Sequence, residues 1–384
     1  MAEPSLTLTL HPSISDIAAV DWDACAGTDN PFVSHAFLSA VEDSGSAGSR
    51  TGWLPQHAVL RDPAGVVVAA APMYAKSHSY GEYVFDHGWA NALERAGGRY
   101  YPKLQVASPF SPVPGPRLLT RPGSGILAAS MATALEQACR QLKLSSVHIT
   151  FCTEPEWDAL GDAGWLQRLG IQFHWENNGY SCFDDFLAAL SSRKRKVLRR
   201  ERRDANDAGL EFVALRGPEI SRAQWDAFHA FYISTTDRKW GSAYLTPEFF
   251  PLLGERLGER VVLMLALHHG QPIAGALNLL GANALYGRNW GCSREFPFLH
   301  FELCYYRAID FGIEHGLSRV EAGAQGEHKI QRGYLPKPTY SAHFIAHTGL
   351  RRAVAEFLVE ERGERIRHIA DLAELSPFRR DGEG

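Results

Sequence analysis

The chain has 384 residues, of which 45% are hydrophobic and 21% are charged, and its formal net charge is −4. A chain of this length is expected to form two domains, and the composition is that of an ordinary globular protein. The slight acidic excess argues against a protein that coats nucleic acid with an overall basic surface, although it leaves room for a local basic site.

The cysteines and the N-terminus predict the compartment. The six cysteines include no C-x-x-C pair and no zinc-ligand spacing with histidines, so we expect reduced thiols and no metal site. Residues 1–14 contain no Lys or Arg, which is not the pattern of a signal peptide. No apolar run approaches the length of about 18 residues that a transmembrane helix needs. These features favour the cytoplasm and leave peripheral membrane contact open.

In chain order, the first half alternates strand and helix patterns. Strands are expected at 56–60 and at 66–74, where Val and Ala are frequent. Five prolines between residues 108 and 123 exclude a helix there. A helix over 126–144 and a buried strand over 146–151 follow.

The second half repeats this order of elements without repeating the residues. Strands are expected at 261–268, 271–280 and 284–290, followed by a helix over 299–315 and a strand over 318–323. Each half therefore offers an antiparallel meander, a helix and a further strand. The predicted segments are an N-terminal domain (1–183), a basic connecting helix (184–206), a C-terminal domain (207–376) and a flexible tail (377–384).

A dense run of positive charge occupies the predicted connecting helix, where residues 193–203 carry eight positive charges and one negative charge. A solvated helix face is the ordinary explanation, but like charges repel along a helix, so such a cluster suits a polyanion better. A coenzyme A diphosphate, an acyl-carrier phosphopantetheine, a tRNA backbone and anionic lipid headgroups all remain open. The predicted phosphate-binding residues are Arg193, Lys194, Arg195, Lys196, Arg199, Arg200 and Arg203.

Three segments place polar residues among aromatic residues and glycine, namely 82–86, 286–291 and 323–336. Glycine-rich turns after strands commonly expose side chains to ligands. Transfer of an acyl group to an amine needs a base that removes a proton from nitrogen, and Glu327 or His328 is the predicted base. It also needs a donor to the developing oxyanion. The predicted donors are Arg288, Arg332 and Tyr334.

Residues in and around these segments are predicted to bind substrate, although an ion pair or a core hydrogen bond is the ordinary explanation for any one of them. The predicted substrate-binding residues are Glu82, Tyr83, Asp86, Lys103, His174, Asn289, Trp290, His300, Glu302 and Lys329. The chain lacks G-x-S-x-G, H-E-x-x-H and a P-loop, which argues against a serine hydrolase, a zinc protease and a P-loop nucleotidase.

Several motifs, taken in order, resemble the FemAB-like branch of the GNAT acyltransferases. They cover nearly the whole chain and lie at 34–38, 53–55, 78–86, 100–104, 172–175 and 323–334. The resemblance implies an α+β fold with two tandem GNAT-like domains, each a mixed, mostly antiparallel sheet flanked by helices. It also implies an enzyme of the N-acyltransferase class.

The resemblance further implies an acyl or aminoacyl donor on a phosphate-bearing carrier, with no permanently bound cofactor. Acyl-CoA, an acyl carrier protein and aminoacyl-tRNA remain open as donors. The acceptor would be a small-molecule or lipid amine, and long-chain N-acylation, as in bacterial ceramide formation, is one option. The basic helix resembles that of the Fem aminoacyltransferases, which transfer amino acids from tRNA to peptidoglycan precursors.

One segment departs from the family pattern. Ordinary GNAT enzymes carry an R/Q-x-x-G-x-G/A phosphate loop before the helix that follows the meander, whereas residues 291–298 contain one glycine and one proline. This difference argues against acetyl-CoA as the donor. The alternative to an enzyme is a non-catalytic GNAT-fold module that binds a nucleic acid or a cell-wall precursor.

Overall fold

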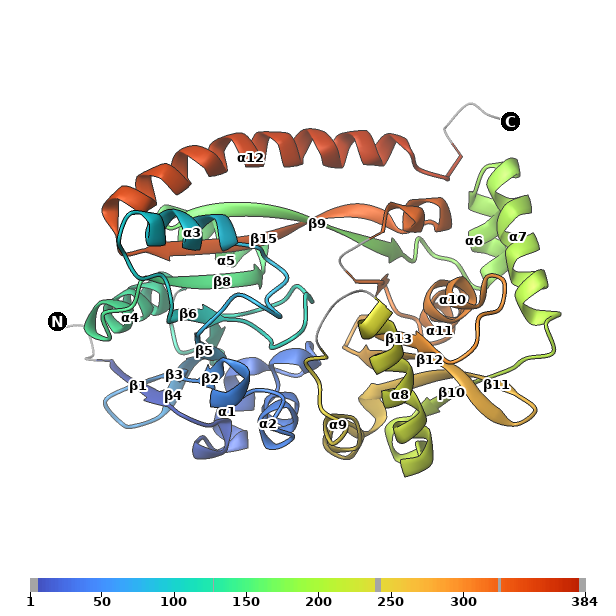
Figure 1. Cartoon of the computed structure of the whole chain (residues 1–384), viewed down its shortest axis with the longest axis horizontal. Helices are drawn as coiled ribbons and strands as arrows, with labels where there is room; N and C mark the ends of the chain where they lie inside the picture. Colours follow the sequence, from blue (N-terminus) through green and yellow to red (C-terminus); the bar gives the residue numbers. More distant parts are fainter. Residues whose placement is uncertain (1–5, 127, 239–242, 324–325, 380–384) are drawn as a thin grey trace. The chain divides into compact units, whose positions relative to one another are not determined.

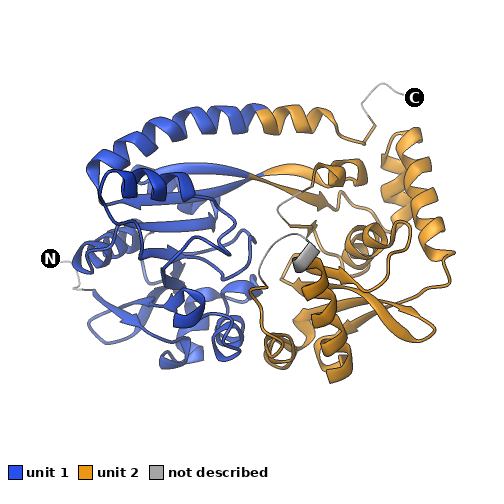
Figure 2. Cartoon of the chain, in the orientation of Figure 1, with its two compact units in different colours: residues 1–170, 338–367 blue, residues 171–337, 368–384 orange. Residues whose placement is uncertain are grey.

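The computed structural model describes residues 6–126, 128–238, 243–323 and 326–379 (Figure 1). The chain divides into two compact units, each built from two stretches of sequence (Figure 2). Unit 1 contains Met1–Gly170 and Pro338–Arg367, and unit 2 contains Ile171–Lys337 and His368–Gly384. Two strands and the last helix have residues in both units, and each unit is described by itself.

Unit 1 contains two groups of paired strands. The first group is antiparallel throughout and has the order β1 (Thr7–His11), β3 (His57–Arg61), β4 (Val67–Ala71) and β7 (Leu119–Thr120). The second group is antiparallel except for the β6–β8 pair. Its order is β2 (Trp53–Pro55), β5 (Met73–Lys76), β6 (Lys103–Val106), β8 (Ser146–Cys152) and β15 (Leu335–Ile345).

Helices flank these strands. They are α1 (Ala19–Ala26), α2 (His35–Asp43), α3 (His87–Arg95), α4 (Ala128–Gln141), α5 (Glu154–Asp162) and α12 (Thr348–Glu374), with short 3-10 turns at Ile14–Asp16, Pro31–Val33 and Ser49–Thr51. All seven residues of β8 are buried. Leu104, Val147 and Leu135 belong to one apolar core, so strands β6 and β8 and helix α4 pack around it.

Unit 2 contains a sheet with the order β10 (Glu211–Arg216), β11 (Val261–His268), β12 (Gln271–Leu280), β13 (Ala284–Cys292), β14 (Arg319–Glu321) and β9 (Leu166–Glu176). Its helices are α6 (Phe183–Ala189), α7 (Ser192–Asn206), α8 (Arg222–Arg238), α9 (Phe249–Leu257), α10 (Leu299–Phe301) and α11 (Arg307–Glu314). Short 3-10 turns lie at Gly217–Glu219, Gly258–Arg260 and Glu327–Arg332.

Strands β13 and β14 form the parallel pair of this sheet, and they pair over three residues only, from Ala284 with Arg319 to Tyr286 with Glu321. Strand β13 continues to Cys292, so the two strands separate after Tyr286. On its other side β13 stays paired with β12, and the register shift there leaves Arg288 as an additional residue in β13.

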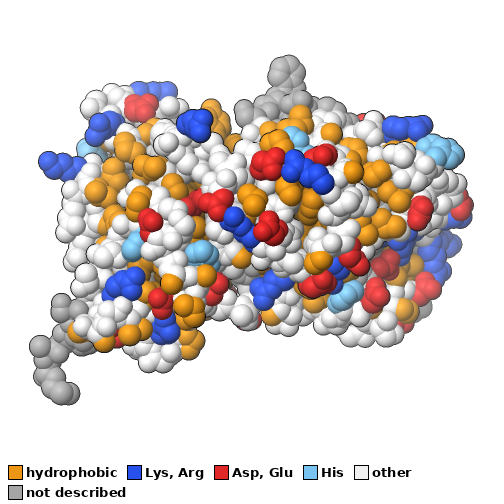
Figure 3. Space-filling view, turned by 90° about the horizontal axis from the view of Figure 1, so that it is seen from below, with side chains coloured by type: hydrophobic (Ala, Val, Ile, Leu, Met, Phe, Trp, Pro, Cys, Tyr) orange, Lys and Arg blue, Asp and Glu red, His pale blue; other side chains and the backbone are white. Residues whose placement is uncertain are grey.

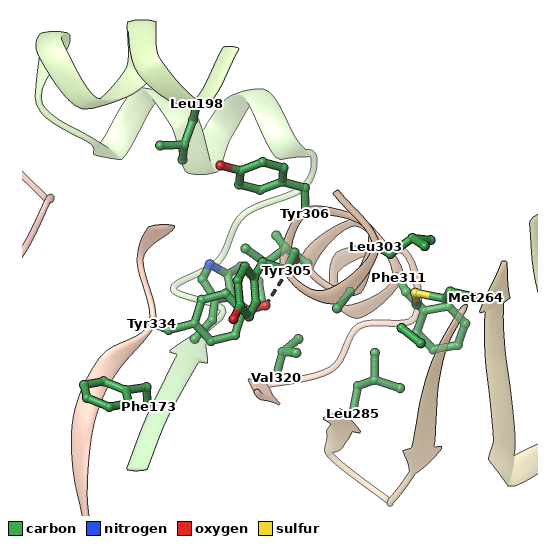
Figure 4. Close-up of a cluster of buried hydrophobic side chains, with 14 of the residues drawn as sticks. Phe173, Leu198, Met264, Leu285, Leu303, Tyr305, Tyr306, Phe311, Val320 and Tyr334 are labelled. Atoms are coloured by element: carbon green, nitrogen blue, oxygen red, sulfur yellow. Dashed lines mark hydrogen bonds between the residues drawn. The ribbon is translucent and has the colours of Figure 1, made fainter. Parts of the chain in front are cut away.

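The core of unit 2 is rich in tyrosine (Figure 4). Tyr305, Tyr306 and Tyr334 lie beside Leu198 of α7, Phe173 of β9 and the strands of the sheet. The hydroxyl of Tyr334 donates to the backbone oxygen of Tyr305 at 3.1 Å. A buried tyrosine hydroxyl needs such a partner, so this bond fixes one turn of the helical segment.

The predicted α+β class and the predicted meanders are confirmed, but several elements differ locally from the prediction. The strand expected at 66–74 is two strands in different groups, β4 and β5, because Pro72 lies between them and has no N–H for a ladder. The helix expected at 299–315 contains a π turn at Glu302–Tyr306.

The helical stretch expected at 184–206 is interrupted at Leu190, which is extended and forms a bridge with Phe378. Residues 377–379, expected in a flexible tail, therefore have partners, whereas 380–384 lie outside the described residues. The domain boundaries at 183, 207 and 376 stay predictions. Among the described residues, no helix combines the length and the apolar character of a membrane span.

Leu198 anchors the basic helix α7 to unit 2, since its side chain is 1% exposed, whereas that of its neighbour Val197 is 44% exposed. We expect Leu198→Ala to lower the free energy of unfolding by about 2–5 kcal/mol, because it removes buried methyl groups and leaves a cavity. The matched change Val197→Ala should cost less than about 0.5 kcal/mol. Urea denaturation measures both values, and equal losses would contradict this account.

Candidate active site

The first candidate site lies in unit 2, beside the point where β13 and β14 separate. Tyr305 belongs to the π turn Glu302–Tyr306, and π turns are rare and frequent at functional sites. Its hydroxyl lies 2.9 Å from Nε2 of His328, which belongs to the 3-10 turn Glu327–Arg332. Burial raises the pKa of Tyr305, so the phenol stays protonated at neutral pH.

Two further predicted residues have their rings beside this pair. The ring of His300 lies 5.3 Å from that of Tyr305, 6.2 Å from that of His328 and 5.1 Å from that of Trp290 on β13. The structure therefore brings together three predicted residues, Trp290, His300 and His328, with Tyr305. Tyr305 is not among the predicted site residues, because its helical spacing marks it only as a core position.

The two predicted bases are in different surroundings. The side chain of Glu327 is 65% exposed, and His368 Nε2 lies 3.9 Å from its carboxylate. His328 is exposed too, but its Nε2 is held by Tyr305. Of the two candidates, His328 is the one joined to the aromatic cluster. Residues 324–325, within the predicted segment 323–334, lie outside the described residues.

Arg332 and Tyr334, predicted as oxyanion donors, are engaged inside unit 2. One guanidinium nitrogen of Arg332 donates to both carboxylate oxygens of Glu201, at 2.8 and 2.9 Å, and another donates to the backbone oxygen of His328 at 2.9 Å. The hydroxyl of Tyr334 donates its hydrogen bond to the backbone oxygen of Tyr305. Both residues thus position the groups around them.

The other predicted residues of unit 2 are held in place or lie on β13. Arg288 and Asn289 are half-buried on that strand. Lys329 donates to the backbone oxygen of Gly323 at 3.1 Å. Glu302 is fully buried, 3.2 Å from both Arg202 and Arg307.

His174 is buried in β9, and its Nε2 lies 3.2 Å from Gln172 Oε1. Burial lowers its pKa, so the ring is neutral.

The predicted phosphate-binding residues belong to α7, whose two sides differ. Glu201 and Arg202 face the core, and Arg202 lies 2.6 Å from Asp310 and 3.2 Å from Glu302. Lys194 contacts Gln331. The exposed cations of the predicted set are Arg193, Lys196, Arg199, Arg200 and Arg203.

Acidic residues balance only part of this exposed charge. Arg199 lies 3.2 Å from Asp184, and Asp204 serves both Arg200 and Arg203. No carboxylate among the described residues lies within 4.0 Å of Lys196 or Arg193. Across the molecular face drawn in Figure 3, by comparison, charges of both signs are intermixed.

The second candidate site is a buried ionic cluster in unit 1, which we call the Lys103 cluster. Its members are Lys76, Ser79, Glu82, Asp86 and Lys103, each at most 3% exposed. The ammonium group of Lys103 donates to Glu82 Oε2 at 2.7 Å and to Asp86 Oδ2 at 2.5 Å. It also donates to Ser79 Oγ at 2.9 Å. Three predicted residues, Glu82, Asp86 and Lys103, therefore form one network.

The carboxylates of this cluster are unequally satisfied. Asp86 Oδ2 accepts a second hydrogen bond from the Tyr100 hydroxyl at 2.7 Å, whereas Glu82 Oε1 and Asp86 Oδ1 accept none. Lys76 donates to the backbone oxygen of Tyr80 and lies 3.8 Å above the Trp53 ring, and its ammonium is 3.8 Å from Glu82 Oε1. Buried carboxylate oxygens without a hydrogen bond are uncommon and call for an explanation.

The surroundings move the pKa values of these groups apart. Burial raises the pKa of Glu82 to about 7 and lowers that of Lys76 to about 7. Burial alone would raise the pKa of Asp86, but Lys103 lowers it below its usual range, so Asp86 stays ionised. Carboxyl groups separated in this way are typical of acid–base sites.

A hydrogen-bonded chain extends from the cluster. The Tyr100 hydroxyl lies 3.1 Å from His148 Nε2, and His148 Nδ1 lies 2.7 Å from His343 Nδ1. Burial lowers the pKa of His148 to about 3, so this imidazole is neutral. Neither histidine is among the predicted site residues, since single histidines within buried strands are typical of core residues. Tyr83, predicted beside Glu82, is partly exposed.

The sequence matches the FemAB-like family, described as peptidoglycan biosynthesis/recognition, over residues 13–380. The chain therefore belongs to the FemAB-like family. Its fold is similar to the crystal structure of FemX, with a TM-score of 0.54, 11% identity and coverage of 91% of this chain and 100% of that chain. A conserved protein of unknown function from Bacteroides thetaiotaomicron VPI-5482 has a TM-score of 0.51 and 10% identity, and the match covers 88% of this chain and 99% of that one.

A tandem GNAT protein from the clavulanic acid biosynthesis pathway aligns with a TM-score of 0.47 and 12% identity over 89% of this chain and 99% of that chain. The predicted FemAB-like family is confirmed, and the similarity to FemX supports the predicted α+β fold. Two curated relatives, from Mycobacterium tuberculosis strains CDC 1551 and H37Rv, are named putative 8-amino-7-oxononanoate synthase 2 and are 27% identical over 170 residues. That match covers 42% of this chain, which spans about a fifth, 21%, of the length of these relatives.

Glu82 gives unit 1 a specific dependence on pH. Its pKa rises from 4.5 in the unfolded chain to about 7, so the folded protein retains a proton that the unfolded chain has released between these values. Stability should therefore fall as pH rises through this window. Glu82→Gln removes this titrating group, so the variant should not lose stability in this way. The free energy of unfolding of the variant minus that of the wild type should therefore increase by roughly 1–3 kcal/mol between pH 5 and pH 7.

Urea denaturation at several pH values measures this difference. The matched control is Glu94→Gln, which changes an exposed glutamate of α3 in the same unit. A difference for Glu82→Gln that stays constant with pH would show that the carboxyl group does not titrate in this window.

Proposed function

We propose that this chain is an N-acyltransferase that moves an acyl or aminoacyl group from a phosphate-bearing carrier to an amine. The observation that carries the proposal is the hydrogen bond between Tyr305 and His328, at the place where β13 and β14 separate. The FemAB-like family and the GNAT-like fold support the acyltransferase class.

The pair suits the proton transfers of this reaction. The imidazole of His328 takes the proton of the attacking amine and becomes an imidazolium, which carries hydrogen on both ring nitrogens. As the N–C bond forms and the bond from the acyl carbon to sulfur or oxygen breaks, Tyr305 gives its proton to the leaving atom. The proton on Nε2 then moves to the tyrosine oxygen, so the charges balance. Arg332, which holds the backbone oxygen of His328, is a positioning residue.

The separation of the strands suits the arm of an acyl carrier. Beyond Tyr286, no described strand pairs with β13 on the β14 side. In this proposal, the amides of a pantetheine arm or an aminoacyl group would bond to peptide groups beside this part of β13. Phosphates of the carrier would contact the exposed cations of α7, which belongs to the same unit. Acyl-CoA, an acyl carrier protein and aminoacyl-tRNA all fit this description.

The acceptor in this proposal is a primary amine. The curated relatives are named for the synthesis of 8-amino-7-oxononanoate, which carries such an amine. The family description points to a cell-wall precursor as another acceptor. The second candidate function is binding without turnover, and it is favoured only by the basic helix. Salt-dependent RNA binding with no product from any donor would establish it in place of the enzyme.

The first test uses acyl-CoA, acyl carrier protein and aminoacyl-tRNA donors with a panel of amines, and product is measured by mass spectrometry. We expect His328→Ala and Tyr305→Phe each to lower kcat/KM by about 10²–10⁴-fold, because each removes one proton transfer. Glu327→Gln is the matched control, since it changes the adjacent exposed residue, and it should retain most activity. Loss of activity with Glu327→Gln but not with His328→Ala would reverse the assignment.

A second test addresses α7. The double change Lys196→Glu and Arg199→Glu should raise KM for the donor by roughly tenfold or more with little change in kcat, because it removes contacts to carrier phosphates. The slope of log KM against log salt concentration should also become shallower. The control is the double change Arg95→Glu and Arg99→Glu, which alters the same charge at exposed positions of unit 1. Equal effects of both pairs would indicate general electrostatics.

A further inference from the structure

The loop between β5 and α3, residues 77–86, has two different sides. Ser79, Glu82 and Asp86 point to Lys103 in the interior, whereas Tyr80 and Phe85 are 61% and 63% exposed. The exposed aromatic residues Tyr80 and Phe85 are therefore sequence neighbours of Ser79 and Asp86, which belong to the buried Lys103 cluster.

Side chains help to hold this loop in place. Residues 78–85 are all described, and none of them belongs to a helix or a strand, although Tyr80 and Gly81 form a turn. The side chains of Trp53 and Lys76 donate hydrogen bonds to the backbone oxygen of Tyr80, and the side chain of Arg168 donates one to the backbone oxygen of Phe85. Tyr83 has a φ of 60°, a conformation that costs energy for a residue other than glycine. A segment outside the helices and strands can open without breaking a strand or a helix.

Two carboxylate oxygens of the cluster beneath the loop accept no hydrogen bond. Lys103 donates to both carboxylates, whereas Lys76 donates to a backbone oxygen and its ammonium lies 3.8 Å from Glu82 Oε1. Glu82 Oε1 and Asp86 Oδ1 are buried and accept no hydrogen bond. An ammonium group offers three donors and a positive charge, which is the complement of such a site.

We propose that loop 77–86 is a lid over a binding site for a primary ammonium group attached to an apolar body, with Glu82 as the group that receives its proton. The ammonium would bond to Glu82 Oε1, and its apolar body would contact Tyr80, Tyr83 and Phe85. Transfer of one proton to the Glu82 carboxylate gives a neutral amine and a carboxylic acid, which returns the proton to water when the lid opens.

This inference names the chemical class of the amine acceptor. It rests on the proposed function only for the later acylation of that amine. Groups that face Glu82 are Lys103 from β6, Lys76 from β5 and Asp86 from the loop. His148 of β8 lies 3.8 Å from Asp86. Burial places the pKa of Glu82 at about 7, which suits proton exchange with an amine near neutral pH.

The test measures binding of hexylamine to the full chain by calorimetry with no acyl donor present, so failure of acyl transfer does not affect it. We expect affinity to fall as pH decreases below 7, because Glu82 becomes protonated. Glu82→Gln should weaken binding by at least roughly tenfold and remove this pH dependence. Hexanol, which has the same apolar body without the charge, should not bind.

Two controls keep the test decisive. Glu42→Gln changes a half-buried glutamate of the same unit whose carboxylate oxygens are both hydrogen-bonded, to His57, Ser13 and the Ile14 backbone, and it should leave affinity unchanged. Phe85→Ser alters an exposed position, so folding is not at risk, and it should weaken hexylamine but not methylamine. Hexylamine should also change hydrogen exchange in 78–86. Equal losses in Glu82→Gln and Glu42→Gln, equal binding of hexanol, or no binding at about 10 mM amine would overturn the proposal.

Discussion

Burial of charge is the constraint on which both units depend. A carboxylate taken out of water needs a cation and hydrogen bonds, and removal of one partner leaves a costly unpaired charge. In unit 1, Lys103 serves Glu82 and Asp86 together. In unit 2, Arg332 serves Glu201. Each ion pair joins segments that are distant in the sequence, so the interactions that neutralise charge also position the loops that carry the candidate groups.

The unit 2 pair shows how such a constraint reaches the site. Arg332 is fixed by Glu201 of α7, and it donates in turn to the backbone oxygen of His328. Arg332 therefore positions His328, which belongs to the same 3-10 turn. The ion pair of Arg332 with Glu201 connects this turn to a helix that lies more than 100 residues earlier in the chain. Tyr305 belongs to a π turn, and the hydroxyl of Tyr334 stabilises that turn by donating to the backbone oxygen of Tyr305.

The sequence was sufficient for some of the elements, although not for the long strands β9 and β15 or for helix α12, and for part of the sites. Alternating and helical periodicities predicted the meanders, and the motifs at 78–86 and 100–104 placed Glu82, Asp86 and Lys103 among the predicted substrate-binding residues without indicating that they form one network. Periodicity cannot show that Tyr305 meets His328, since the two belong to separate turns. Residue type alone also cannot distinguish Arg332 on a buried carboxylate from an arginine that faces a ligand. Lys76 and His148 were missed because burial, not type, makes them unusual.

The two sides of α7 explain why a helix with so much like charge is stable. Repulsion among the outer cations opposes the helix, and acidic neighbours relieve only some of it. The inner side contributes the burial of Leu198, the Glu201–Arg332 pair and the bonds of Arg202 to Asp310 and Glu302. Core packing thus offsets a repulsion that the outer side retains. A bound polyanion would relieve that repulsion, so the uncompensated charge favours an anionic partner over an ordinary solvated face.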